Sequence, residues 1–218
     1  MRFDYQEALA GKSLLLLDFD GPVCSVFAGY PAPQIAAALV ETIDGFAPGL
    51  AAGLKGERDP MEVLRSASES LPAELVDRVD EQLNRAELQA VESAEPTPGA
   101  ADLMADASRS GITVAIVSNN GADAIAKYLN DRALAGYIHT ITGRPFGKPE
   151  LMKPDPYLLR HVLSSTGTEV ERACFIGDSV TDIEAGAAVG VATVGYANKP
   201  GKAERLHEAG AKSVVDTL

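Results

Sequence analysis

The sequence is poor in cysteine, in cationic residues and in long apolar runs. Its 218 residues include two cysteines, Cys24 and Cys174, each beside apolar residues, so we expect no disulfide framework and a reducing, cytoplasmic setting. Lys and Arg number 19 against 31 Asp and Glu, and the resulting net charge of −12 argues against nucleic-acid partners and anionic membrane surfaces. No stretch approaches the roughly 20 apolar residues of a membrane span, and the N-terminal residues contain no signal-like apolar segment.

Short apolar runs alternate with helical stretches through most of the chain. Continuous runs such as LLLLD predict strands buried on both faces of a parallel sheet. These predicted strands lie at 14–18, 112–118, 173–178 and 191–196, with weaker ones at 137–143 and 212–216. The predicted helices between them lie at 99–110, 121–130, 155–165, 181–189 and 202–209. This alternation predicts an α/β fold with a doubly wound parallel sheet.

Residues 26–95 interrupt this rhythm. The segment has no clear strand run, and its apolar residues recur at helical spacing, as in Val79 and Leu83. We therefore expect an α-helical cap subdomain at 26–95, inserted into an α/β core domain made of 1–25 and 96–218. The Pro-rich stretch 95–99 marks the return to the core.

Four polar clusters lie near the ends of predicted strands or at the start of a helix. They contain Asp18 and Asp20, Ser118 and Asn119, Lys153, and Asp178 and Asp182. Each cluster taken alone has an ordinary explanation, as a helix N-cap or a surface lysine. Ligands of open α/β sheets bind beyond the carboxyl ends of the strands, so the four segments are expected to converge on one site.

The acidic residues of these clusters indicate phosphoryl-transfer chemistry. A carboxylate at Asp18 can act as a nucleophile on phosphorus, and Asp20, two residues on, can act as general acid and then as base. Four crowded carboxylates require a cation, and an all-oxygen ligand set favours Mg²⁺. The expected ligands are Asp18, the backbone carbonyl of Asp20 and Asp178, with Asp182 acting through water.

The remaining polar residues suit binding of the phosphate group. The Ser118 hydroxyl and the Asn119 backbone N–H can donate to phosphate oxygens at the start of the following helix, where the helix dipole favours an anion. The Lys153 ammonium can contact both the phosphate and Asp18, stabilising charge that develops during transfer.

Together these residues resemble the motifs of the haloacid dehalogenase superfamily, in its phosphatase-like branch with a helical cap. LLLLDFDGPV resembles the first motif with Asp18 and Asp20, Ser118 the second, Lys153 the third, and GDSVTD at 177–182 the fourth. The resemblance spans nearly the whole chain. It implies a Mg²⁺-dependent phosphomonoester hydrolase that acts on a small phosphorylated metabolite through an aspartyl-phosphate. We expect the protein to be a monomer or homodimer. Asp20 favours phosphoryl transfer over dehalogenation, because the dehalogenases of the superfamily lack it.

The cap segment GLKGER at 53–58 resembles the substrate-specificity loop of related capped enzymes, including sugar-phosphate mutases. That resemblance implies that Lys55 and Arg58 contact the substrate; a solvated loop is the alternative. Two other functions remain open. One is a sugar-phosphate phosphomutase, which returns the phosphoryl group to its substrate, and the other is a non-catalytic module that binds a phosphorylated ligand.

Overall fold

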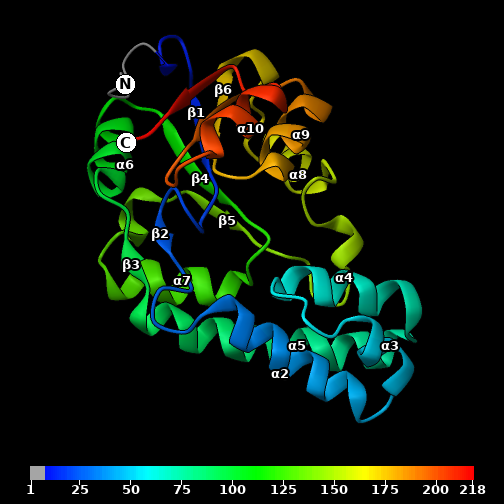
Figure 1. Ribbon diagram of the computed structural model, residues 1–218. Helices are drawn as coiled ribbons and strands as arrows, with labels where there is room; N and C mark the ends of the chain where they lie inside the picture. The colour runs from blue at the N-terminus through cyan, green and yellow to red at the C-terminus, as the bar shows by residue number, and fades with distance from the viewer. Residues whose placement is uncertain (1–7) are drawn as a thin grey trace.

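The core of the protein is a six-stranded parallel sheet with the strand order β5-β4-β1-β6-β7-β8, seen in a computed structural model that describes residues 8–218 (Figure 1). Residues 1–7 of the predicted core domain lie outside the described residues. The strands are β1 (Leu14–Leu17), β4 (Thr113–Val117), β5 (Thr140–Thr142), β6 (Ala173–Gly177), β7 (Ala192–Tyr196) and β8 (Ser213–Val215). Every one lies inside a predicted strand run, and all neighbouring pairs are parallel, which confirms the α/β fold.

Helices cover both faces of the sheet. They are α6 (Ala100–Arg109), α7 (Ala122–Asp131), α8 (Tyr157–Thr166), α9 (Val180–Val189) and α10 (Lys202–Glu208). The four consecutive leucines of β1 suit a strand that is covered on both faces, because all four are buried. Leu15 and Leu17 pack in the core that includes α6 and α7, whereas Leu14 and Leu16 pack against α8 on the other face.

A second group of helices lies below the sheet in Figure 1. It comprises α2 (Ala32–Asp44), α3 (Pro48–Gly53), α4 (Pro60–Ser70) and α5 (Ala73–Ala90). We call these helices the cap. The chain enters the cap through β2 (Cys24–Ser25) and leaves through β3 (Glu95–Pro96), and these two short strands pair with each other in antiparallel fashion. The pairing falls at the domain boundaries expected from the sequence, which remain a proposal.

The connections between these elements include four short 3-10 helices. These are η1 (Val91–Ser93), η2 (Ala135–Tyr137), η3 (Pro149–Leu151) and η4 (Val170–Arg172). Within the part of the chain that the structure describes, no helix combines the length and apolar character that crossing a membrane requires.

Candidate active site

Three adjacent strands place the polar clusters at one edge of the sheet. Asp18 directly follows β1, Ser118 follows β4, and Asp178 follows β6. Since β1 lies between β4 and β6, the carboxyl ends of these strands bring the three side chains together. Lys153 comes from the loop before α8 and is almost completely buried.

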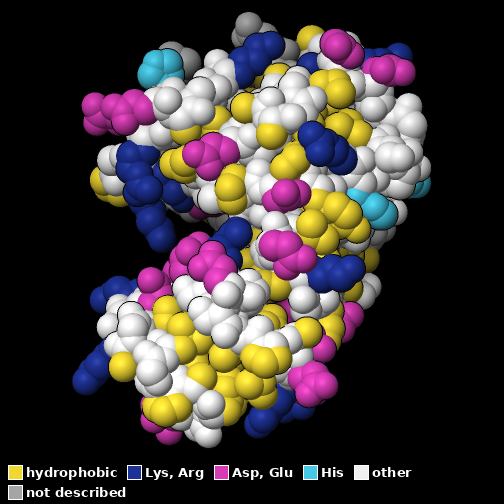
Figure 2. Space-filling view, turned by 90° about the vertical axis from the view of Figure 1, so that its right-hand side faces the viewer, with side chains coloured by type: hydrophobic (Ala, Val, Ile, Leu, Met, Phe, Trp, Pro, Cys, Tyr) yellow, Lys and Arg dark blue, Asp and Glu magenta, His cyan; other side chains and the backbone are white. Residues whose placement is uncertain are grey.

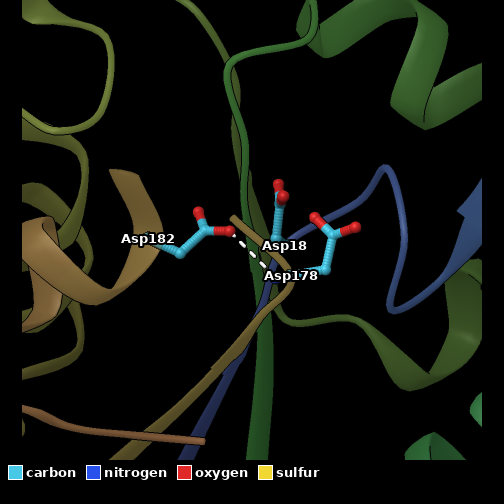
Figure 3. A group of neighbouring side chains, drawn as sticks. All are labelled: Asp18, Asp178 and Asp182. Atoms are coloured by element: carbon cyan, nitrogen blue, oxygen red, sulfur yellow. Dashed lines mark hydrogen bonds between the residues drawn. The ribbon is translucent and has the colours of Figure 1, made fainter. Parts of the chain in front are cut away.

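Three carboxylates converge at this edge (Figure 3). One oxygen from each of Asp18, Asp178 and Asp182 lies within 4.8 Å of the other two. Gly21 allows the loop after β1 to pass this close, because it has a φ of +112° and a Cβ at its position would clash with the Asp178 carboxyl group. The donor set consists of hard oxygen ligands and carries excess negative charge, so its chemistry fits a hard divalent cation such as Mg²⁺.

Asp182 differs from the other two carboxylates because its oxygens already accept several donors. It forms a capping box with Ser179 at the start of α9, and its Oδ2 accepts hydrogen bonds from the backbone N–H groups of Asp178 and Ser179, both at 3.0 Å. Its Oδ1 lies 2.6 Å from Lys153 Nζ. These contacts suit a carboxylate that orders the Asp178 loop and holds Lys153.

Lys153 connects the carboxylates to the neighbouring strand. Its Nζ lies 2.9 Å from Asp18 Oδ1 and donates to the Val117 carbonyl at 3.0 Å. Burial disfavours the charged amine, but Asp18 and Asp182 outweigh burial and raise the pKa of Lys153. The side chain is therefore a fixed cation beside Asp18.

Burial raises the pKa of three carboxyl groups at this edge of the sheet. The pKa of Asp18 rises to about 7, because desolvation and the charge of Asp182 outweigh the attraction of Lys153. Desolvation also raises the pKa of Asp20 and of Asp178 to about 6 each. A carboxyl group with a pKa near 6 can supply a proton close to neutral pH.

Asp178 also contacts a lysine that sequence reasoning did not identify. Lys202, at the start of α10, donates to Asp178 Oδ2, and Asn198 Nδ2 donates to the same oxygen at 3.3 Å. Neither residue belongs to one of the four motifs: Asn198 lies in the loop between β7 and α10, and Lys202 is the first residue of α10.

The loop after β4 positions its polar residues through side chains as well as backbone. The Asn119 side chain donates to the Lys153 carbonyl at 3.0 Å and accepts from the Lys153 N–H at 2.8 Å, so it fixes the backbone of Lys153. Ser118 Oγ donates to Asn120 Oδ1 at 3.1 Å. At the start of α7, where the sequence predicts an advantage for a bound anion, the Gly121 N–H donates to the cap carboxylate of Glu87 at 3.1 Å.

A pocket of about 180 Å³ lies between these residues and the cap. From the core it is lined by Asp18, Asp20, Ser118, Asn119, Lys153 and Asp178, among others. Figure 2 shows the surface hollowed between the cap and the core, with acidic side chains gathered on the cap side. All core residues that the sequence predicts for the site are thus brought together, with Asp182 directly behind the pocket.

The cap residues that line the pocket differ from those expected. Lys55 and Arg58 are exposed, and neither lines it, so contact with a substrate there remains a proposal. The cap instead contributes Asp59, Met61, Glu62 and Arg65. The Arg65 guanidinium, on α4, donates to the Lys153 carbonyl and lies 3.2 Å from Glu62. Helical spacing places Arg65 on α4 but does not distinguish it from a solvated arginine.

Arg144 is another residue without a sequence signal. It follows β5 and is 6% exposed, and it pairs with two buried carboxylates of cap helix α5, Asp80 and Glu87. The Arg144 partners lie 64 and 57 residues away in sequence, so no local pattern reports them.

Comparison with known proteins identifies relatives of the whole chain. The family described as haloacid dehalogenase-like hydrolase matches residues 13–190. A phosphoglycolate phosphatase of Pseudomonas savastanoi pv. phaseolicola is 26% identical over 98% of this chain and 80% of its own length. A heptose-bisphosphate phosphatase of Pseudomonas putida, named as D-glycero-beta-D-manno-heptose-1,7-bisphosphate 7-phosphatase, is 33% identical over 56% of this chain and 78% of its own.

Solved structures share the fold at lower sequence identity. A β-phosphoglucomutase from Clostridium difficile superposes with a TM-score of 0.71 at 22% identity, covering 94% of this chain and 91% of its own. A haloacid dehalogenase-like family hydrolase from Streptococcus pneumoniae gives a TM-score of 0.68 at 14% identity, covering 95% of each chain. With most of the sequence matched and the expected motif residues assembled at one sheet edge, the chain belongs to the haloacid dehalogenase-like hydrolase family of enzymes, among its phosphatase-type members.

Proposed function

We propose that the protein is a Mg²⁺-dependent phosphomonoester hydrolase that acts on a small phosphorylated metabolite through a phosphorylated Asp18. The observation that carries the proposal is the contact of Asp18 with a buried lysine inside a cluster of carboxylates. Asp18 Oδ1 lies 2.9 Å from Lys153 Nζ, and Asp18 shares the acidic cluster with Asp178 and Asp182. That arrangement suits a nucleophilic carboxylate that must approach an anionic ester.

In the first step, an Asp18 oxygen forms a bond to phosphorus while the ester bond from phosphorus to the leaving oxygen breaks. Asp20 lines the same pocket, and its pKa of about 6 lets it deliver a proton to the leaving oxygen. Its Oδ1 accepts a hydrogen bond from the Val26 N–H at 2.9 Å, which holds the carboxyl group in place. Lys153 and Ser118 bind the transferring phosphoryl oxygens.

In the second step, Asp20 takes a proton from a water molecule that attacks phosphorus. The bond from phosphorus to Asp18 breaks, inorganic phosphate leaves, and both carboxyl groups return to their starting forms. When bound by Asp18, the Asp20 carbonyl and Asp178, Mg²⁺ supplies positive charge that offsets repulsion between carboxylates and phosphate. The side chain of Asp182 then holds Lys153 and acts on the ion at most through water.

The pocket suggests a small substrate that carries a group for the cap to recognise. A volume of about 180 Å³ between core and cap leaves little room beyond a phosphoryl group and a short carbon chain. Among the described pocket-lining residues, Arg65 is the one cation from the cap. Together with the phosphoglycolate phosphatases among the relatives, this makes 2-phosphoglycolate the first substrate to test.

The test is release of inorganic phosphate from a panel of small phosphorylated metabolites, with and without Mg²⁺, compared by kcat/KM. We expect Mg²⁺-dependent turnover, abolished by Asp18→Asn and retained by Asp44→Asn, an equivalent change at an exposed cap position. Full activity of Asp18→Asn would eliminate the proposed nucleophile. Isomerisation of a sugar phosphate without phosphate release would instead identify a mutase, and binding without turnover would identify a non-catalytic module.

A further inference from the structure

Arg144 joins the core to cap helix α5 through a buried network of hydrogen bonds. Its Nε donates to Asp80 Oδ1 at 2.9 Å, and its two terminal nitrogens donate to the two oxygens of Glu87 at 3.1 and 3.0 Å. It also donates to Asn84 Oδ1 and to the Asn119 carbonyl, both at 2.7 Å. Residues 80, 84 and 87 share one face of α5, so a single arginine fixes that face on the core.

Glu87 extends this network to the loop that carries Ser118. Its Oε1 accepts from Asn120 Nδ2 at 2.9 Å, and its Oε2 accepts from the Gly121 N–H at 3.1 Å. Asp80 makes no such link, because its second oxygen accepts from the Gly147 N–H at 2.8 Å. The two carboxylates therefore share Arg144 but differ in their other partners.

The contact with Glu87 determines which way the Asn120 amide faces. A carboxylate only accepts hydrogen bonds, so the amide nitrogen of Asn120 must point to Glu87 and its oxygen must point to Ser118. Ser118 Oγ donates to that oxygen at 3.1 Å and accepts from the Asn120 N–H at 3.3 Å. The position of the Ser118 hydroxyl thus depends, through one amide, on a carboxylate of the cap.

We propose that Glu87 is a positioning residue for the reaction: it orients Asn120, which holds Ser118 Oγ beside the phosphoryl site, and the single hydroxyl proton of Ser118 turns from Asn120 Oδ1 to a phosphoryl oxygen when the substrate binds. The inference rests on the proposed phosphatase function. It assigns a role to a cap residue that does not line the pocket. The cap therefore acts on phosphate binding through α5 as well as by covering the site.

Glu87→Gln and Asp80→Asn form a matched pair of variants. Each oxygen of Glu87 accepts two hydrogen bonds, so a glutamine amide in either orientation opposes a donor to a donor. Asp80→Asn creates the same conflict with Arg144 or Gly147 without touching Asn120. Both variants are expected to lower thermal stability, whereas only Glu87→Gln is expected to weaken phosphate binding.

The experiment measures kcat/KM with para-nitrophenyl phosphate and the inhibition constant of inorganic phosphate. For Glu87→Gln we expect the inhibition constant to rise about tenfold, and for Asp80→Asn to change less than about twofold. In a Ser118→Ala background, Glu87→Gln should add less than about a twofold change, because both substitutions remove the same interaction. If Glu87→Gln folds poorly, Asn120→Ser replaces it as the test, because this substitution leaves the ion pairs with Arg144 intact. Asn120→Ser should also raise the inhibition constant of phosphate about tenfold.

Wild-type turnover is measured first, because its absence refutes the proposed function and, with it, this role of Glu87. When the wild type is active, equal effects of Glu87→Gln and Asp80→Asn on phosphate inhibition would refute the positioning role alone. Additive effects of Glu87→Gln and Ser118→Ala would also refute it, as would unchanged phosphate inhibition in Asn120→Ser.

Discussion

Replacement of Arg144 by methionine would remove a guanidinium that is 6% exposed while leaving its two carboxylate partners in place. Asp80 and Glu87 are completely buried. Burial lowers the pKa of Arg144, but the two carboxylates outweigh this effect and raise that pKa. Loss of one partner of a buried ion pair typically costs about 3–5 kcal/mol, because the remaining charge stays desolvated. For a chain of this size, that corresponds to a fall in Tm of roughly 6–20 °C.

The assay is urea denaturation followed by circular dichroism, together with thermal unfolding. The control is Arg85→Met, the same substitution on cap helix α5, which carries the two carboxylate partners of Arg144. Arg85 pairs with Glu81 at 2.6 Å, but the two side chains are 72% and 58% exposed, so we expect a loss below about 1 kcal/mol. A similarly small loss for Arg144→Met would show that the buried network does not hold the cap on the core, and would refute the reasoning.

Three further predictions concern the metal site, the general acid Asp20 and the recognition of the substrate. Because the pKa values of Asp18 and Asp178 are raised from 3.8 to about 7 and 6, their contribution to stability is present below pH 3.8 and is lost as pH rises to 7. Mg²⁺ competes with those protons, so it should raise the Tm more at about pH 8 than at about pH 5. Asp178→Asn should largely remove this increase in Tm. Equal Tm shifts at both pH values would contradict the prediction. In the Mg²⁺-loaded enzyme, where the metal keeps Asp18 ionised, Asp20 as general acid with a pKa of about 6 should make kcat/KM decline as pH rises above that value for a substrate with a poor leaving group. A pH-independent rate would argue against Asp20. Arg65→Ala should lower kcat/KM for 2-phosphoglycolate about tenfold and for para-nitrophenyl phosphate much less, since only 2-phosphoglycolate offers a carboxylate. Equal losses for the two substrates would mean that Arg65 acts through its contact with the Lys153 carbonyl and not on the substrate.

The core could be predicted from the sequence because parallel strands buried on both faces form continuous apolar runs. The LLLL run of β1 is the clearest example, and all four leucines are buried. The residues that follow these strands must meet at the sheet's carboxyl edge, so Asp18, Ser118 and Asp178 could be placed together before any coordinates.

The contacts between cap and core could not be predicted in this way. Asp80 and Glu87 are acidic residues on an amphipathic helix, where such residues usually face solvent, yet both are buried against Arg144. Their burial depends on how two distant segments pack, which periodicity does not encode. For the same reason, the resemblance of a short loop pointed to Lys55 as a substrate contact, while the described pocket is lined by Arg65.

The central claim is that Asp18 carries the phosphoryl group during turnover. The most direct measurement mixes the Mg²⁺-loaded enzyme with an active substrate, quenches in acid within the first turnover, and locates the modification by mass spectrometry of proteolytic fragments. We predict one added phosphoryl group on the fragment that contains Asp18, labile to base and absent from Asp18→Asn. A burst of phosphate release with no modified Asp18, or a phosphoryl group on another residue, would contradict the account.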